Sequence, residues 1–223
     1  MPKVKVPRKS TPIDMTAMCD VAFLLLSFFI LTTKFKPSEA LAVVTPNSVS
    51  NKVAPQNDAV LITIDKDGKV YFSVSDDNKT EKQAILQAVN TSQSLGLTDA
   101  EIASFNRSGS YIGVPFSKLK SFLKLDPEQL KKTPLEGIPV TDSTNNQLTE
   151  WMRVAASAFQ GTKMNLLVKG DNASKYPAFQ GVTNAFKKND LMKFQMITNP
   201  EGVPPGTELY RKNMSAPAAA ESE

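Results

Sequence analysis

The feature that most constrains this chain is an apolar run that contains one carboxylate. The stretch MTAMCDVAFLLLSFFILTT, residues 15–33, carries Asp20 as its only charged residue. Nineteen residues at 1.5 Å per residue give a helix of roughly 28 Å, which is close to the roughly 30 Å hydrocarbon core of a bilayer. The sequence therefore predicts a single transmembrane helix, which we place at residues 15–35.

Two other interpretations of the run stay open. A buried helix of a soluble domain would have to cover residues 21–31, which are apolar on all sides. A secretory signal peptide would use the basic residues before the run and a small-residue cleavage site that ends at Ala42, although Lys34 and Lys36 lie in between. The length of the run and these two lysines favour the transmembrane helix.

Charge predicts the orientation of that helix. Lys34 and Lys36 are the only basic residues that follow the run closely, whereas more precede it, namely Lys3, Lys5, Arg8 and Lys9. Because basic residues are retained on the cytoplasmic side of a membrane, residues 1–14 are expected in the cytoplasm. The part of the chain beyond the helix is then expected outside.

Asp20 shares one side of the predicted helix with other polar residues. At 100° per residue, Thr16, Asp20 and Ser27 fall within about 40° of one line. Such a stripe would be unsatisfied in lipid, so we expect it to face other transmembrane helices or a narrow water-filled path, where Asp20 could take up and release protons. The alternative is an interfacial residue that simply reaches water.

The composition gives little support for enzyme chemistry. The 223 residues include no histidine, and the only cysteine, Cys19, lies inside the apolar run. There is no Gly-rich phosphate loop and no GxSxG motif, so no catalytic residue, cofactor or metal site is expected. The net charge is +4, but basic and acidic residues are interspersed, which argues against nucleic acid as a partner.

Residues 36–58 have the composition of a linker, because Pro, Ser and Asn recur there without sustained periodicity. Within this segment a β-branched run is bounded by turn residues, which favours strand pairing with a partner. The candidate strand consists of Leu41, Ala42, Val43, Val44 and Thr45. We expect it to pair with a domain outside the membrane, such as that of a second copy of the chain, during part of a working cycle.

Residues 59–198 are expected to form a compact α/β domain. Strand-forming residues on both sides of Asp65-Lys66-Asp67-Gly68 predict a hairpin over residues 59–74. A strand, an amphipathic helix and a final strand over residues 164–198 favour parallel neighbours joined by a right-handed crossover. The other expected segments are a helix from a capping Thr80 to Gly96, an insertion at about 97–145, a helix at 147–159 and a flexible tail at 199–223.

Two residues of this domain invite a functional interpretation that we do not favour. Trp151 is the only tryptophan, and we expect it to pack against the insertion rather than grip a ligand. Asp171 follows a predicted strand, and without a base or nucleophile nearby in sequence it is expected to serve a turn or a helix cap.

These segments together resemble the ExbD/TolR family. The segment IDMTAMCDVAFLLLSFFILTT, residues 13–33, is similar to the family's amino-terminal pattern at Thr16, Asp20 and Val21, while Asp14 and Ala17 stand where the family has Asn and Pro. Residues 60–72 resemble the family's first periplasmic hairpin. Residues 166–198 resemble its closing strand, helix and strand.

The resemblance implies a fold, a location and a function. The fold is a single N-terminal transmembrane helix of the inner membrane, followed by a small periplasmic α/β domain, a mixed sheet with helices packed on it. In the family, paired helices sit inside an ExbB ring, and proton flow through the membrane aspartate energises TonB. By position Asp20 would carry protons, supported by Thr16 and Ser27. The implied partners are an ExbB-like ring, a second copy of the chain, a TonB-like periplasmic protein and membrane lipid.

A second class of function stays open. The helix could be only an anchor for a periplasmic binding or structural module, either of the Tol type or for attachment to the cell wall. Asp20 discriminates between the two classes, because proton exchange needs its carboxyl group and anchoring does not.

Overall fold

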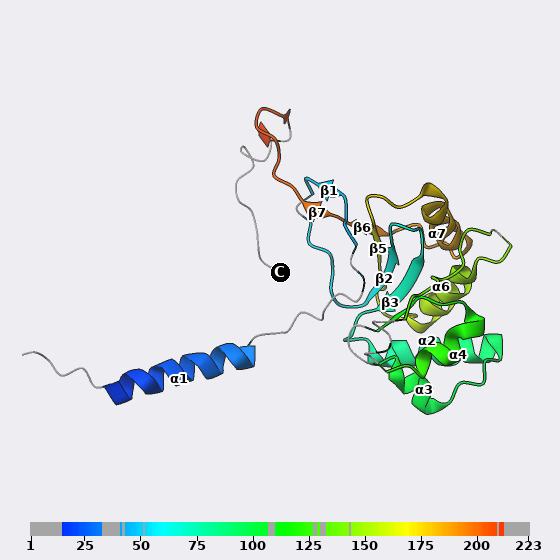
Figure 1. Ribbon diagram of the computed structural model, residues 1–223. Coiled ribbons are helices and arrows are strands. Elements are labelled where there is room, and N and C mark those ends of the chain that lie inside the picture. Colours follow the sequence, from blue (N-terminus) through cyan, green and yellow to red (C-terminus); the bar gives the residue numbers. More distant parts are fainter. Residues whose placement is uncertain are drawn as a thin grey trace, which may run out of the picture. The chain divides into compact units, whose positions relative to one another are not determined.

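The computed structural model describes residues 15–32, 41, 43–50, 52–106, 110–126, 129, 133–142, 144–208 and 210–211. The chain divides into two units, residues 1–37 and 38–223. The first unit contains helix α1 (Met15–Thr32), and the second contains the strands and the other helices (Figure 1). The expected cytoplasmic segment 1–14 and the last expected helical residues, 33–35, lie outside the described residues.

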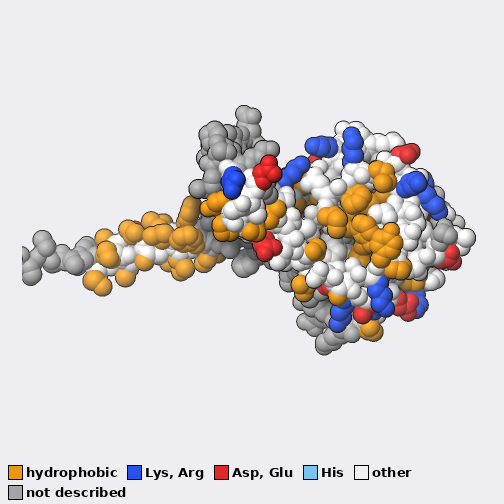
Figure 2. Space-filling model, turned by 90° about the horizontal axis from the view of Figure 1, so that it is seen from above, with side chains coloured by type: hydrophobic (Ala, Val, Ile, Leu, Met, Phe, Trp, Pro, Cys, Tyr) orange, Lys and Arg blue, Asp and Glu red, His pale blue; other side chains and the backbone are white. Residues whose placement is uncertain are grey.

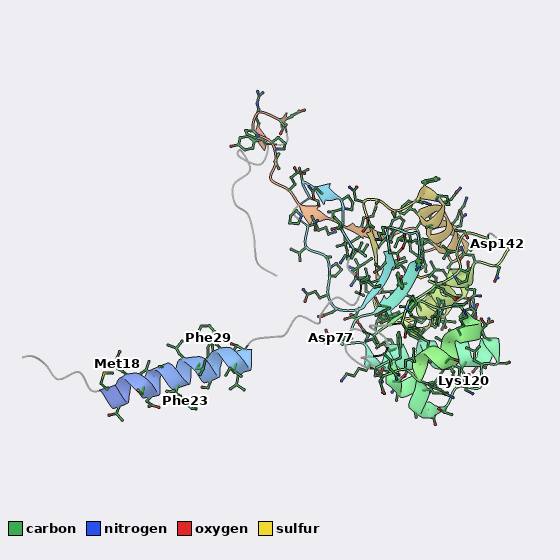
Figure 3. All side chains as sticks on the ribbon, viewed as in Figure 1. Met18, Phe23, Phe29, Asp77, Lys120 and Asp142 are labelled. Carbon is green, nitrogen blue, oxygen red and sulfur yellow. The ribbon has the colours of Figure 1, made fainter. Side chains whose placement is uncertain are left out.

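Helix α1 is mostly apolar, and Thr16, Asp20 and Ser27 are its polar residues along one side. Its large hydrophobic side chains are all at least half exposed, up to 85% at Leu31, and none of its residues is buried. Met18 and Phe29 project from one side of the helix and Phe23 from the other (Figure 3), and hydrophobic side chains cover its length (Figure 2). By length and composition α1 could cross a membrane, as the sequence predicts.

The second unit is built on a mixed sheet with the strand order β4-β3-β2-β5-β6. β2 (Ala59–Ile64) pairs antiparallel with β3 (Val70–Val74), which pairs antiparallel with β4 (Tyr111–Ile112). On its other side β2 pairs in parallel with β5 (Asn165–Gly170), and β5 pairs in parallel with β6 (Gln195–Ile197). The predicted mixed sheet and the parallel closing crossover are both confirmed.

The turn between β2 and β3 is organised by Asp65. Its Oδ1 accepts hydrogen bonds from the backbone N–H groups of Asp67 (2.9 Å) and Lys69 (2.8 Å), and its Oδ2 accepts one from the Tyr71 hydroxyl (3.0 Å). Gly68 adopts φ +81°, which a residue without Cβ reaches at no steric cost. The predicted hairpin around these residues is therefore confirmed.

Three helices form a layer on the sheet (Figure 1). α6 (Gln147–Ala158) lies between α2 (Lys79–Gln93) and α7 (Tyr176–Lys188). Their buried apolar faces close the core, with Trp151 fully buried and stacked on Phe72 of β3 at 5.2 Å between ring centroids. Burying aromatic surface of this size is among the largest favourable terms in a small domain.

The insertion folds into the same core. Besides β4 it contributes α3 (Asp99–Ser104) and α4 (Phe116–Leu123), and the Phe116 ring packs on Trp151 at 5.6 Å between centroids. The expected contact between Trp151 and the insertion is thus confirmed. Lys82 of α2 is fully buried beneath the insertion, where its Nζ pairs with Asp76 (2.7 Å) and lies 5.8 Å from the Phe105 ring centroid.

Helix α2 begins and ends earlier than the sequence predicts. It starts at Lys79 with Asn78 in the N-cap position, so the expected cap at Thr80 is wrong. The Asn78 carbonyl accepts the first helical hydrogen bond, while its side chain donates to Asp58 at 2.8 Å. The helix ends at Gln93, because Ser94 turns left-handed (φ +51°) before Gly96 is reached.

The structure also differs from the expected linker and tail. β1 (Asn47–Ser48) pairs in parallel with β7 (Asn199–Pro200), so each segment supplies a short strand to the other. The N–H and C=O groups of an extended backbone need hydrogen-bond partners. Each of these two segments supplies partners for backbone groups of the other. The expected tail residues 209 and 212–223 lie outside the described residues.

Candidate functional site

Helix α1 carries the polar residues singled out in the sequence. Thr16, Asp20 and Ser27 lie within one continuous helix, so their spacing places them along one side of it. Asp20 is exposed and lies in the second turn, roughly 7 Å along the axis from Met15. It is the only charged residue of α1.

The hydroxyl groups of α1 can be satisfied by the helix itself. Ser27 Oγ donates to the carbonyl of Leu24 at 2.9 Å, and Thr32 Oγ1 donates to the carbonyl of Phe28 at 2.8 Å. A carboxylate has no such route to the helix carbonyls, because in its ionised form it only accepts hydrogen bonds. On insertion scales an Asp at the membrane centre costs about 2.5–3.5 kcal/mol, and less nearer the interface, so a membrane-spanning α1 would be favoured by polar groups of other helices beside Asp20.

A second candidate site lies in the α/β unit, where the expected linker meets the end of β5. The backbone N–H of Val44 donates to Asp171 Oδ2 at 3.0 Å, and the Val44 carbonyl accepts from the N–H of Asn172 at 2.8 Å. Asp171 Oδ1 also accepts from the N–H of Ala173 at 2.9 Å, which closes a turn. The predicted turn role of Asp171 is confirmed, and the contact with Val44 adds a long-range role.

Residues around Val44 extend this contact. The Thr45 side chain is buried, and its carbonyl accepts from Asn199 Nδ2 at 3.1 Å. The backbone N–H groups of Asn199 and Glu201 then donate to the carbonyls of Pro46 and Ser48, at 2.9 Å each. We call residues 43–48 the docked segment, because the turn after β5 and residues 199–201 together hold it on the domain.

The charge of Asp171 is favoured by this geometry. The N–H of Ala173, and after it the N–H of Val44, stabilise the carboxylate and lower the pKa of Asp171 below its usual value. Lys66 adds a smaller favourable charge. The ionised form of Asp171 is therefore the form that binds the docked segment more strongly.

The structure places the candidate strand 41–45 only in part. Leu41 packs against the core, Val43 is half-buried, and Ala42 lies outside the described residues. The ladder itself forms slightly later, at Asn47 and Ser48, with β7 of the same chain. Pairing with a second copy stays a prediction.

Sequence reasoning missed the docked segment as a site. A β-branched run inside a linker was a usable signal for strand pairing, but nothing in the sequence pointed to Asp171 or Asn199 as its partners. Among the described residues, no group of three or more His, Cys, Asp or Glu side chains could hold a metal ion.

Comparison with known proteins gives one match. The family model described as Biopolymer transport protein ExbD/TolR matches residues 7–201, which include α1, the docked segment and all strands of the sheet. Neither a curated protein nor a solved structure matches the chain at a significant level.

Proposed function

The chain belongs to the ExbD/TolR family of biopolymer transport proteins, and from this premise we propose that it is the proton-carrying subunit of an ExbB-ExbD-type inner-membrane complex. In this complex the chain converts proton motive force into mechanical work for TonB-dependent transport across the outer membrane. The observation that carries the proposal is Asp20, the only charge on a helix that is otherwise mostly apolar.

The proposed arrangement surrounds the Asp20 carboxylate with polar groups inside the membrane. One helix cannot enclose a proton path, so a ring of ExbB-like helices and a second copy of α1 supply the surrounding polar groups. A proton that falls through 100 mV releases roughly 2.3 kcal/mol. Residues 1–14 lie in the cytoplasm and the α/β unit in the periplasm, where it passes the work to a TonB-like partner.

The test removes the titratable group and keeps its shape. Asp20→Asn is expected to lower proton-driven uptake to the level seen when a protonophore collapses the membrane potential, while membrane insertion and folding stay normal. Met18→Leu is the matched control, because at 100° per residue Met18 lies on the opposite side of the same helix from the polar stripe. It is expected to transport at the wild-type rate.

The alternative is a membrane-anchored periplasmic module, of the Tol type or for cell-wall attachment, in which α1 is only an anchor. An Asp20→Asn chain that inserts and still supports uptake at the wild-type rate favours that alternative and contradicts the proton-carrying role. Co-purification of the full chain with its membrane and periplasmic partners distinguishes a TonB-like from a Tol-type recipient of the work.

A further inference from the structure

Several segments of the chain meet at one end of the mixed sheet. β2 and β5 run in parallel and end together, because Ile64 is in register with Gly170 (Figure 1). The turn that follows β5 binds Val44 of the docked segment through hydrogen bonds, and it leads into α7, which begins at Tyr176. The docked segment, this turn and the start of α7 therefore lie at the same end of the domain.

The turn of the β2–β3 hairpin lies at this end as well. A Cβ atom built on Gly68 would lie 3.4 Å from the Cβ atom of Ala178, which is in the first turn of α7. The charge of Lys66, in the same hairpin turn, is near enough to help lower the pKa of Asp171. We use the name domain tip for the following exposed residues of these segments: Val44, Lys66, Lys175, Tyr176 and Pro177.

The domain tip presents large apolar side chains to solvent. Tyr176 is 70% exposed and Val44 is 68% exposed, and among the large hydrophobic residues described in the α/β unit only Val53 is more exposed. Single exposed apolar side chains are normal on a protein surface, but these two lie on segments that one turn joins, with Pro177 beside them. Tyrosine is enriched where membranes meet water, because its ring is apolar and its hydroxyl is polar.

The charged groups at this end are compatible with a lipid surface. Lys66 and Lys175 are exposed, and a lysine can lay its apolar stem against lipid while its ammonium group reaches the phosphates. Asp65 and Asp171 direct their carboxylates at backbone N–H groups of the domain, which leaves Asp67 as the exposed carboxylate of the two turns. Attraction to anionic lipid is therefore modest, and apolar contact has to contribute to binding.

We propose that the domain tip rests on the surface of the bilayer that α1 spans, with Tyr176 and Val44 in the headgroup layer and the two lysines at the lipid phosphates. The proposal rests on the proposed function in one respect, namely that α1 spans the membrane. From Thr32 to Val43 the chain can span at most roughly 36–40 Å. The domain tip is thus the end of the domain at which the chain from the membrane arrives, and it lies within reach of the lipid.

Contact of so few side chains with lipid is weak for a free domain, since even a myristoyl chain gives only marginal binding. Attachment to α1 through a short length of chain raises the effective concentration of the domain tip at the surface to the order of millimolar. The contact can then form and break readily, which leaves the domain able to move during a working cycle.

The test is quenching of tryptophan fluorescence by lipids brominated near the headgroup, with the full chain in vesicles of phosphatidylcholine and phosphatidylglycerol. Tyr176→Trp places a reporter in the domain tip. Gln160→Trp is the matched control, because Gln160 is exposed in the turn before β5, at the other end of that strand. The native Trp151 is fully buried and gives both variants the same background. Quenching is expected to be several-fold greater in Tyr176→Trp than in Gln160→Trp.

The two lysines are tested in the Tyr176→Trp chain. Lys66→Gln together with Lys175→Gln is expected to reduce the quenching in vesicles that contain phosphatidylglycerol, because the attraction to lipid phosphates is lost. Lys163→Gln together with Lys187→Gln removes the same charge from exposed positions outside the domain tip and should leave the quenching unchanged. Equal losses in the two double variants would show that net charge, and not the domain tip, brings the domain to the lipid.

Two further outcomes overturn the proposal. Equal quenching in Tyr176→Trp and Gln160→Trp would show that the domain tip has no preferred contact with lipid. Shielding of the Tyr176→Trp reporter from acrylamide, without quenching by brominated lipid, would show that protein covers the domain tip, such as a second copy of the chain. Flotation of the chain with the vesicles reports the insertion of α1 separately. Proton transport is not measured, so a failure here is distinguishable from a failure of Asp20→Asn.

Discussion

At the scale of single residues, Asp171 joins parts of the chain that are 127 residues apart. Its carboxylate accepts the N–H of Val44 in the docked segment and the N–H of Ala173 in the turn after β5. Hydrogen bonds to a charged acceptor are stronger than neutral ones, so both are strongest when the Asp171 side chain is ionised. The charge of the Asp171 side chain therefore affects how firmly the docked segment is held on the domain.

Loss of that charge is expected to release the docked segment. In Asp171→Asn, the Val44 amide should exchange its hydrogen several times faster than in the wild type, because its acceptor is no longer charged. Asp77→Asn is the control, since Asp77 is an exposed carboxylate of the same domain (Figure 3). If the Val44 amide is equally protected from hydrogen exchange in Asp171→Asn and Asp77→Asn, the β1–β7 pairing alone holds the docked segment.

Acid should have the same effect as the substitution. The pKa of Asp171 is lowered in the folded chain, so its stabilising contribution is fully present above the ordinary Asp pKa of about 3.9 and is lost as the pH falls through the lower, folded value. Protection of the Val44 amide, corrected for intrinsic exchange, is therefore expected to decline only below about pH 4. A decline centred near neutral pH would point to a different group.

At the scale of elements, α7 is fixed by a close approach to the insertion. A Cβ atom built on Gly181 would lie 2.3 Å from the Val140 carbonyl oxygen. The Gly181 carbonyl in turn accepts from Asn146 Nδ2 at 2.7 Å, at the start of α6. Because Gly181 has no side chain, helix α7 can pack directly against the backbone of Val140 and against the start of α6.

Gly181→Ala is expected to destabilise the domain in spite of the helix propensity of alanine. Alanine is favoured over glycine in a helix by about 1 kcal/mol, but overpacking against a backbone atom typically costs about 1–3 kcal/mol. A lower unfolding temperature of the purified full chain is the expected result. Gln180 lies on the exposed side of the same helix, so Gln180→Ala should leave the unfolding temperature unchanged or raise it slightly. A Gly181→Ala chain as stable as the wild type would mean that α7 can shift away from Val140.

Elements with strong local patterns were predictable from the sequence, and contacts between distant segments were not. The hairpin around Asp65 and the strand, helix and strand of residues 164–198 follow from turn residues and periodicity. The position of Asn78 as the start of α2 depends on its bond to Asp58, which sequence spacing does not reveal. The docked segment was missed for the same reason, because Asp171 and Asn199 are brought to it only by the fold.

At the scale of the whole molecule, docking sets the length of chain between the membrane helix and the domain. From Thr32 to Val43 the chain can span at most roughly 36–40 Å, whereas from Thr32 to the start of β2 it can span at most roughly 89–97 Å. A slack tether transmits force poorly. The hydrogen bonds of Val44 with Asp171 and Asn172 therefore shorten the path through which the proposed proton-driven movement of α1 would reach the α/β domain.

The corresponding prediction is that transport requires the docked segment. Val44→Pro removes the N–H that donates to Asp171, and the exposed Val44 side chain contributes little packing, so folding should be preserved. We expect proton-driven uptake to fall in Val44→Pro and in Asp171→Asn while membrane insertion stays normal. Val43→Pro, which tests strand pairing of residues 41–45 with a partner, should lower uptake as well, because proline restricts the chain and removes a ladder donor. Asp77→Asn should transport at the wild-type rate. Hydrogen exchange at the Thr45 amide shows whether the docked segment is released in Val44→Pro. If it is released and uptake is still normal, the work reaches the domain without docking.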